Sequence, residues 1–108
     1  MKPPNYRIVV LEPASRDVQE QYDYIRQRSP TGAESWYEAY LNALESLRSD
    51  PLGPSVAPED EHVEEIIRQV FFRTRRGHPY RIVYTVIDDE VRVLRLRGFG
   101  QDLMGPEE

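Results

Sequence analysis

The first half of the chain contains a short apolar run followed by two segments whose apolar residues recur every three to four positions. The run at residues 6–12 is rich in β-branched and aromatic side chains, which predicts a strand that ends at Pro13. Ser15 is a favoured residue type for a helix N-cap, so we predict a helix from there to about Arg28. Its apolar positions have helical spacing: Val18, Tyr22 and Ile25.

A second helix is predicted over residues 33–48, after a break of turn-forming residues at 29–32. Its wide apolar stripe is expected to pack in the core: Ala33, Trp36, Tyr37, Tyr40, Leu41, Leu44 and Leu47. Because so few residues join the two helices, they should lie antiparallel as a helical hairpin. Residues 50–54, with two prolines and a glycine, end the second helix.

The second half of the chain has a different pattern, in which apolar runs alternate with short polar turns at 75–79 and 88–90. Three runs predict strands: 66–74, 80–87 and 91–96. The order of elements is therefore β-α-α-β-β-β, which indicates a single α+β domain over residues 1–108. We expect the helical hairpin to pack on one face of a mostly antiparallel four-stranded sheet.

Composition excludes several classes of protein and site. The longest aliphatic run, residues 8–11, is too short to span a bilayer or to form a signal peptide, so a cytoplasmic location without membrane contact is expected. The chain has no cysteine for a disulfide or a thiolate metal site. Residues 59–65 are acidic and include His62, but a solvated loop explains them better than a metal site does. We expect neither a metal nor a cofactor, and we expect His78 to be a turn residue rather than a catalytic one.

Charge is distributed unevenly. The net charge of the chain is −5, which by itself argues against a nucleic-acid partner. Residues 73–97, however, carry seven arginines and three acidic residues, a net charge of +4, whereas residues 1–72 carry −6. One basic segment therefore lies inside an acidic protein.

Side chains alternate between the two faces of a strand, which divides the residues of the predicted sheet. Leu94 and Leu96, with the row from Tyr80 to Val86, are expected under the helices. The candidate residues for binding a target or nucleic acid are Arg73, Arg75, Arg76, Arg81, Arg95 and Arg97. The apolar residues expected among them, as a partner-binding surface, are Phe71, Val83 and Val93. Such a face suits phosphate groups or an acidic or amphipathic segment of a partner; alternatively, its arginines pair with nearby acidic residues such as those at 88–90.

Three stretches of sequence match one known family in order and spacing. The sequence Y-R-I-V-Y at residues 80–84, followed by Val86, is similar to a Y-R-I-x-Y-x-V strand, and residues 89–97 are similar to the closing strand of the same family. The helical part matches at spaced positions: Tyr24, Ile25, Ala33, Trp36, Leu44, Leu47, Pro51 and Gly53. Over nearly its whole length, the chain resembles the RelE/ParE superfamily of toxins.

This resemblance implies a toxin of a type II toxin–antitoxin system, often described as plasmid stabilisation, that inhibits growth. It also implies a cognate antitoxin, one segment of which folds onto the toxin, in a heterotetramer or larger complex. Two activities divide the superfamily: RelE-like members cleave messenger RNA on the ribosome, and ParE-like members inhibit DNA gyrase without being nucleases. In the RelE-like members, an arginine near the end of the strand that precedes the first hairpin turn takes part in cleavage of the RNA. Arg73 matches this arginine, with Arg75 as the alternative.

The sequence departs from the nuclease pattern after the last strand. Relatives carry a stretch like L-R-H-x-R-R-D, whereas residues 96–102 are L-R-G-F-G-Q-D, and no tyrosine follows Tyr84. Several groups that a ribonuclease needs are therefore missing. We expect a ParE-like toxin that inhibits gyrase and replication without being an enzyme. The alternatives are a ribosome-dependent messenger-RNA endoribonuclease and a catalytically silent relative that only binds antitoxin.

Overall fold

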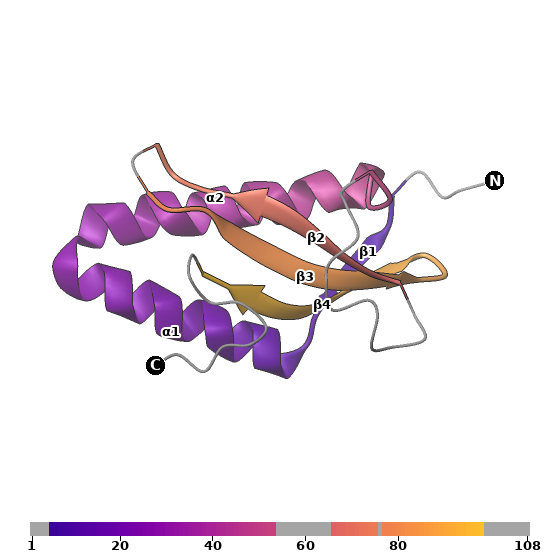
Figure 1. Cartoon of the computed structure of the whole chain (residues 1–108), viewed down its shortest axis with the longest axis horizontal. Coiled ribbons are helices and arrows are strands. Elements are labelled where there is room, and N and C mark those ends of the chain that lie inside the picture. The colour runs from indigo at the N-terminus through magenta and orange to yellow at the C-terminus, as the bar shows by residue number, and fades with distance from the viewer. Residues whose placement is uncertain (1–4, 54–65, 76, 99–108) are drawn as a thin grey trace.

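The computed structural model describes residues 5–53, 66–75 and 77–98, and its elements follow the predicted order (Figure 1). They are β1 (Arg7–Val10), α1 (Glu12–Arg28), α2 (Pro30–Ser49), β2 (Ile67–Phe72), β3 (Tyr80–Ile87) and β4 (Glu90–Arg97). The α+β class and the order β-α-α-β-β-β are thereby confirmed. The predicted acidic loop, which includes His62, lies outside the described residues, as do Arg76 and the residues after Gly98.

The four strands form one sheet in the order β1-β4-β3-β2. β1 is parallel to β4, whereas β3 is antiparallel to both β4 and β2, so the prediction of a mostly antiparallel sheet is confirmed. The helical hairpin carries the chain from β1 across the sheet, and α1 and α2 lie on the same face of it (Figure 1). We call the opposite face of the sheet the outer face.

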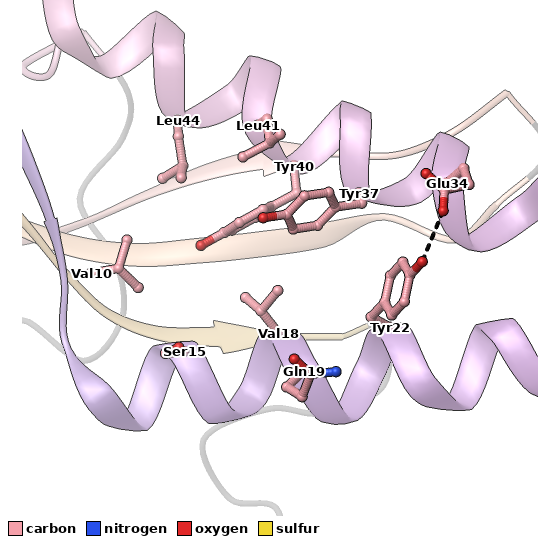
Figure 2. A pocket seen from close by; sticks show the side chains of 10 residues that line it. All are labelled: Val10, Ser15, Val18, Gln19, Tyr22, Glu34, Tyr37, Tyr40, Leu41 and Leu44. Carbon is pink, nitrogen blue, oxygen red and sulfur yellow. Dashed lines mark hydrogen bonds between the residues drawn. The ribbon is translucent and has the colours of Figure 1, made fainter.

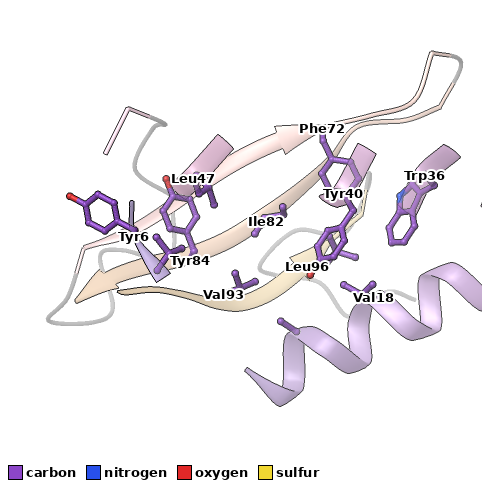
Figure 3. Close-up of a cluster of buried hydrophobic side chains, with 12 residues drawn as sticks. Tyr6, Val18, Trp36, Tyr40, Leu47, Phe72, Ile82, Tyr84, Val93 and Leu96 are labelled. Atoms are coloured by element: carbon purple, nitrogen blue, oxygen red, sulfur yellow. The ribbon is translucent and has the colours of Figure 1, made fainter. Parts of the chain in front are cut away.

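The core lies between the helical hairpin and the sheet (Figure 3). Its buried residues include Ala14, Val18, Trp36, Tyr40 and Leu47 from the helices, and Phe72, Ile82, Tyr84, Val91, Val93 and Leu96 from the strands. The ring of Trp36 lies 5.4 Å from that of Tyr80 and 5.8 Å from that of Phe72, measured between centroids. At the other end, the Tyr84 hydroxyl donates to the Pro51 carbonyl at 2.5 Å and so ties the chain after α2 to the sheet.

Both helices begin earlier than predicted. α1 begins at Glu12 after an N-cap at Leu11, so Pro13 belongs to the first turn and the prediction of Ser15 as N-cap is wrong. Proline is tolerated there because the first N–H groups of a helix have no intrahelical acceptor. The carboxylate of Glu12 is also favourable near the positive end of the helix dipole.

The predicted break at residues 29–32 is reduced to one residue. Ser29 caps α2, its hydroxyl oxygen accepting a hydrogen bond from the backbone N–H of Gly32 at 2.9 Å. Pro30, Thr31 and Gly32 form the first turn of α2, where proline supplies the helical φ angle. The link is therefore short enough to make the helices an antiparallel hairpin, as expected.

A register shift in β4 changes which of its residues face the core. Val83 pairs with Arg95 but Tyr84 pairs with Val93, so Leu94 is an extra residue in β4, as in a β-bulge. Val93 is 1% exposed in the main core, and the prediction that it lies on the outer face is wrong. Leu94, predicted under the helices, packs instead against Ile67 and Val83.

Candidate functional site

The outer face is assembled from three strands whose pairing brings distant residues together. Phe71 of β2 lies opposite Arg81 of β3, and Arg81 lies opposite Arg97 of β4. Next to this row, Gln69 lies opposite Val83, and Val83 lies opposite Arg95. The structure therefore brings together Phe71, Arg81, Arg95 and Arg97, as the sequence predicts.

The apolar residues predicted for partner binding differ sharply in exposure. Phe71 is 57% exposed, whereas Val83 lies on the outer face but is only 3% exposed. Val93 is absent from this face, as described above. Of the three predicted residues, Phe71 is the one that presents its side chain to solvent.

The arginines of the basic segment fall into groups with different surroundings. Arg73 and Arg75 follow the end of β2, and both are exposed. Arg81 is 9% exposed and donates from Nη1 to the side-chain oxygen of Gln69 at 3.1 Å. Directly across from it, Arg97 has a buried Nε–H with no hydrogen-bond acceptor.

Arg95 is held by α1. Its Nε and Nη2 donate to the two carboxylate oxygens of Asp17 at 2.8 and 3.1 Å, and Asp17 also accepts the backbone N–H of Leu96 at 3.0 Å. The hydrogen bonds to Asp17 raise the pKa of Arg95 above its ordinary value. Arg95 is therefore a structural anchor in this state, although the sequence groups it with the target-binding arginines.

Acidic residues of the last turn neutralise a different part of the basic segment. Arg92 donates from Nε to Glu90 at 2.7 Å, and Arg7 lies 3.1 Å from the same carboxylate and 3.6 Å from that of Asp89. Neither Arg92 nor Arg7 belongs to the predicted outer face, so these pairs do not bear out the alternative prediction; among the outer-face arginines, Arg95 pairs with an acid, but with Asp17 rather than with the residues at 88–90. In the described part of the chain, no ion pair involves Arg73, Arg75 or Arg97.

A groove of about 540 Å³ lies between α1 and α2 (Figure 2). Its lining is mostly apolar and aromatic: Val10, Ser15, Val18, Gln19, Tyr22, Glu34, Tyr37, Tyr40, Leu41 and Leu44. At one end the hydroxyl of Tyr22 donates to Glu34 at 2.9 Å, which raises the pKa of that tyrosine. We call this the hairpin groove.

Sequence reasoning missed the hairpin groove because the whole apolar stripe of α2 was assigned to the core. Trp36, Tyr40 and Leu47 are indeed buried, but Tyr37 and Leu41 are 40% and 43% exposed, so the prediction is wrong for these two. The signal was the width of the stripe. The residues of this stripe cover more of the helix circumference than one sheet can bury.

In residues 5–53, 66–75 and 77–98, no group of three or more His, Asp or Glu side chains is placed to hold a metal ion. No helix among these residues is long and apolar enough to cross a membrane. His78 is exposed in the connection between β2 and β3.

Most of the chain is similar to one family of known proteins. A family model described as "ParE toxin of type II toxin-antitoxin system, parDE" matches residues 8–103, which include all six helices and strands except the first residue of β1. The search of curated proteins found no match.

Proposed function

Because this chain belongs to the ParE toxin family of type II toxin–antitoxin systems, we propose that it inhibits DNA gyrase and that an antitoxin neutralises it by binding in the hairpin groove. The observation that carries this proposal is the groove itself. It leaves Tyr37 and Leu41 exposed beside buried core residues. Contiguous apolar surface of this kind marks a protein interaction site more often than an unused surface.

The shape of the groove fits one class of partner. Two antiparallel helices form its walls, and Val18 and Tyr40 lie deep between them (Figure 2). An amphipathic segment can place apolar side chains there at helical spacing, which is the helix-in-groove mode of recognition. Antitoxin segments that fold on binding would bury Tyr37 and Leu41 in this way.

The charged groups of the outer face support a non-enzymatic toxin. Cleavage of RNA needs side chains that take up and release protons near neutral pH. On and just beyond the strands at the Phe71 end of the outer face, the charged groups among the described residues are Arg73, Arg75, Arg81 and Arg97, while His78 lies exposed in the β2–β3 connection as the predicted turn residue. Arginine stays protonated in proteins, so these groups bind anions but exchange no protons. This favours inhibition of gyrase over the endoribonuclease predicted as an alternative.

The first experiment measures supercoiling by purified gyrase in the presence of the purified chain, with and without the cognate antitoxin. Inhibition that the antitoxin relieves is expected. A parallel reaction with ribosomes and messenger RNA separates the alternatives, because cleavage there, with gyrase unaffected, would establish the ribonuclease. If expression arrests growth and gyrase remains active, the proposed target is wrong. If growth is unaffected, the chain is a silent relative that binds antitoxin.

The second experiment tests the hairpin groove. Leu41→Asp places a charge in the groove and is expected to weaken antitoxin binding at least tenfold, measured by calorimetry. Leu52→Asp is the matched control, because Leu52 is also about half exposed but lies outside the groove. Equal affinities for the two variants would exclude the groove as the antitoxin site. Light scattering of the wild-type complex would also show whether it is the predicted heterotetramer or larger.

A further inference from the structure

We propose that the antitoxin segment in the hairpin groove places a basic side chain, an arginine or a lysine, against Glu34 and the rings of Tyr22 and Tyr37. These three residues form what we call the acidic corner of the groove. The inference rests on the proposed binding of an antitoxin in the groove, and it adds the charge of that partner and the end of the groove at which the charge lies.

Glu34 brings a charge to an otherwise neutral groove. Among the described residues, the groove lining contains one charged side chain, that of Glu34. This side chain is exposed at one end of the groove, where its Oε2 atom accepts the hydrogen bond from Tyr22 (Figure 2). In the described part of the chain, Glu34 forms no ion pair and its Oε1 atom accepts no hydrogen bond. Tyr22 therefore orients the carboxylate and leaves one oxygen for a cation.

Two aromatic rings border the same end of the groove. The rings of Tyr22 and Tyr37 lie 5.9 Å apart between centroids, with an angle of 74° between their planes. A cation held by the Glu34 carboxylate would lie beside these rings, and the face of an aromatic ring attracts a cation. The rings can also cover the aliphatic part of an arginine or lysine side chain. An acidic side chain would instead be repelled by the carboxylate and by the negative ring faces.

The two helices around the groove carry an excess of negative charge. α1 and α2 contain seven acidic residues and four arginines, a net charge of −3. Three of these arginines already have partners in the hairpin: Arg16 pairs with Glu12, Arg48 pairs with Glu45, and Arg28 lies over the ring of Tyr24. The fourth, Arg26, forms no ion pair with Glu34 among the described residues. A basic partner segment is therefore attracted to this surface, whereas an acidic one is repelled.

The position of Glu34 on α2 determines where the basic residue lies in the partner. Leu41 follows Glu34 by seven residues, which is about two turns of helix and about 10 Å along the axis. A helical segment that packs apolar side chains against Leu41 should therefore carry its basic residue about two turns away, on the same face.

The test is calorimetric titration of the purified full chain with the purified antitoxin at low and at high salt. Glu34→Gln removes the charge but keeps an oxygen that can accept the Tyr22 hydroxyl. It is expected to weaken binding about fivefold at low salt, the upper value for an exposed ion pair, and by less at high salt. Glu20→Gln is the matched control, because Glu20 is an exposed acidic residue of α1 that lies outside the groove. This variant should bind like the wild type.

A charge reversal identifies the partner residue. Glu34→Arg should weaken binding more than Glu34→Gln does, because it places a cation opposite the basic side chain of the partner. Replacement of that one antitoxin residue by glutamate should restore binding to Glu34→Arg and weaken binding to the wild-type chain. Thermal melts confirm that every variant is folded.

The outcomes separate this inference from the proposed function. If Leu41→Asp weakens binding but Glu34→Gln binds like the wild type at low salt, the inference is wrong and the groove remains the antitoxin site. If neither variant weakens binding, both the inference and the proposed antitoxin site are wrong. Tighter binding by Glu34→Gln would show that the partner presents an acidic side chain, which also overturns the inference. Gyrase is absent from these measurements, so failure of the proposed inhibition leaves their outcome unaffected.

Discussion

Replacement of Asp17 by alanine should destabilise the junction between α1 and β4. β1 pairs with β4 as far as Val93, and Asp17 accepts the next outward backbone N–H, that of Leu96, together with two bonds from Arg95. The Arg95 side chain is 43% exposed, so water screens its ion pair, which contributes about 0.5–1 kcal/mol. The Leu96 N–H loses its acceptor, which costs roughly 1–3 kcal/mol. Asp17→Ala should therefore lower the free energy of unfolding by about 1.5–4 kcal/mol.

Urea denaturation at neutral pH measures this change. The control is Asp23→Ala on the same helix, where an exposed carboxylate accepts one bond from Gln19. Its effect should stay within about 0.5 kcal/mol. Arg95→Met keeps the bond between Leu96 and Asp17, so its loss should be clearly smaller than that of Asp17→Ala. If Asp17→Ala and Asp23→Ala unfold at the same urea concentration, the reasoning about this junction is refuted.

Three further predictions follow from burial and register. Burial raises the pKa of Tyr40 and Tyr84 to about 12, above the ordinary value of 10 that applies in the unfolded chain. Their contribution to the free energy of unfolding is therefore complete below about pH 10 and is lost between about pH 10 and 12. Urea denaturation at a series of pH values checks this, and a free energy of unfolding that stays constant over that range would contradict it. Val93→Ala should lower the free energy of unfolding by about 2 kcal/mol, and Leu94→Ala by less, because the first lies in the main core; the reverse order would argue against the register shift. Arg97→Met should raise the melting temperature, because it removes a buried donor that has no acceptor; a lower melting temperature would contradict this.

The elements were predictable from the sequence because each has a strong local signal. The apolar spacing of α2 and the β-branched runs of β3 and β4 require no knowledge of the rest of the molecule. Helix starts were less predictable, since two local rules competed at each. The sequence predicts that Pro13 ends a strand and that Pro30 lies in a break, yet proline also suits the first turn of a helix, and both helices have it there.

The faces of β4 were not predictable from the sequence. Strict alternation places Val93 with Arg95 and Arg97, and nothing local to these residues indicates an extra residue at Leu94. The shift is visible in the pairing of β4 with β3, which is a property of two strands and not of one. The same error affects the predicted partner-binding residues, because alternation along β4 wrongly places Val93 among them. Phe71 is placed correctly, because its strand has a regular register throughout.

The hairpin groove and the outer face lie on opposite sides of the sheet and differ in composition. The groove offers apolar area between two helices, whereas the outer face carries arginines and the exposed ring of Phe71. The main core lies between them, so neither surface shares a side chain with the other. In the described part of the chain, the pair of Arg95 and Asp17 joins the basic strand to the helix that lines the groove. Asp17 lies next to Val18, which lines the groove, so the same turn of α1 contributes to the groove and holds Arg95. Loss of the Asp17 junction is therefore expected to affect both surfaces, whereas Leu41 and Phe71 variants should each affect one.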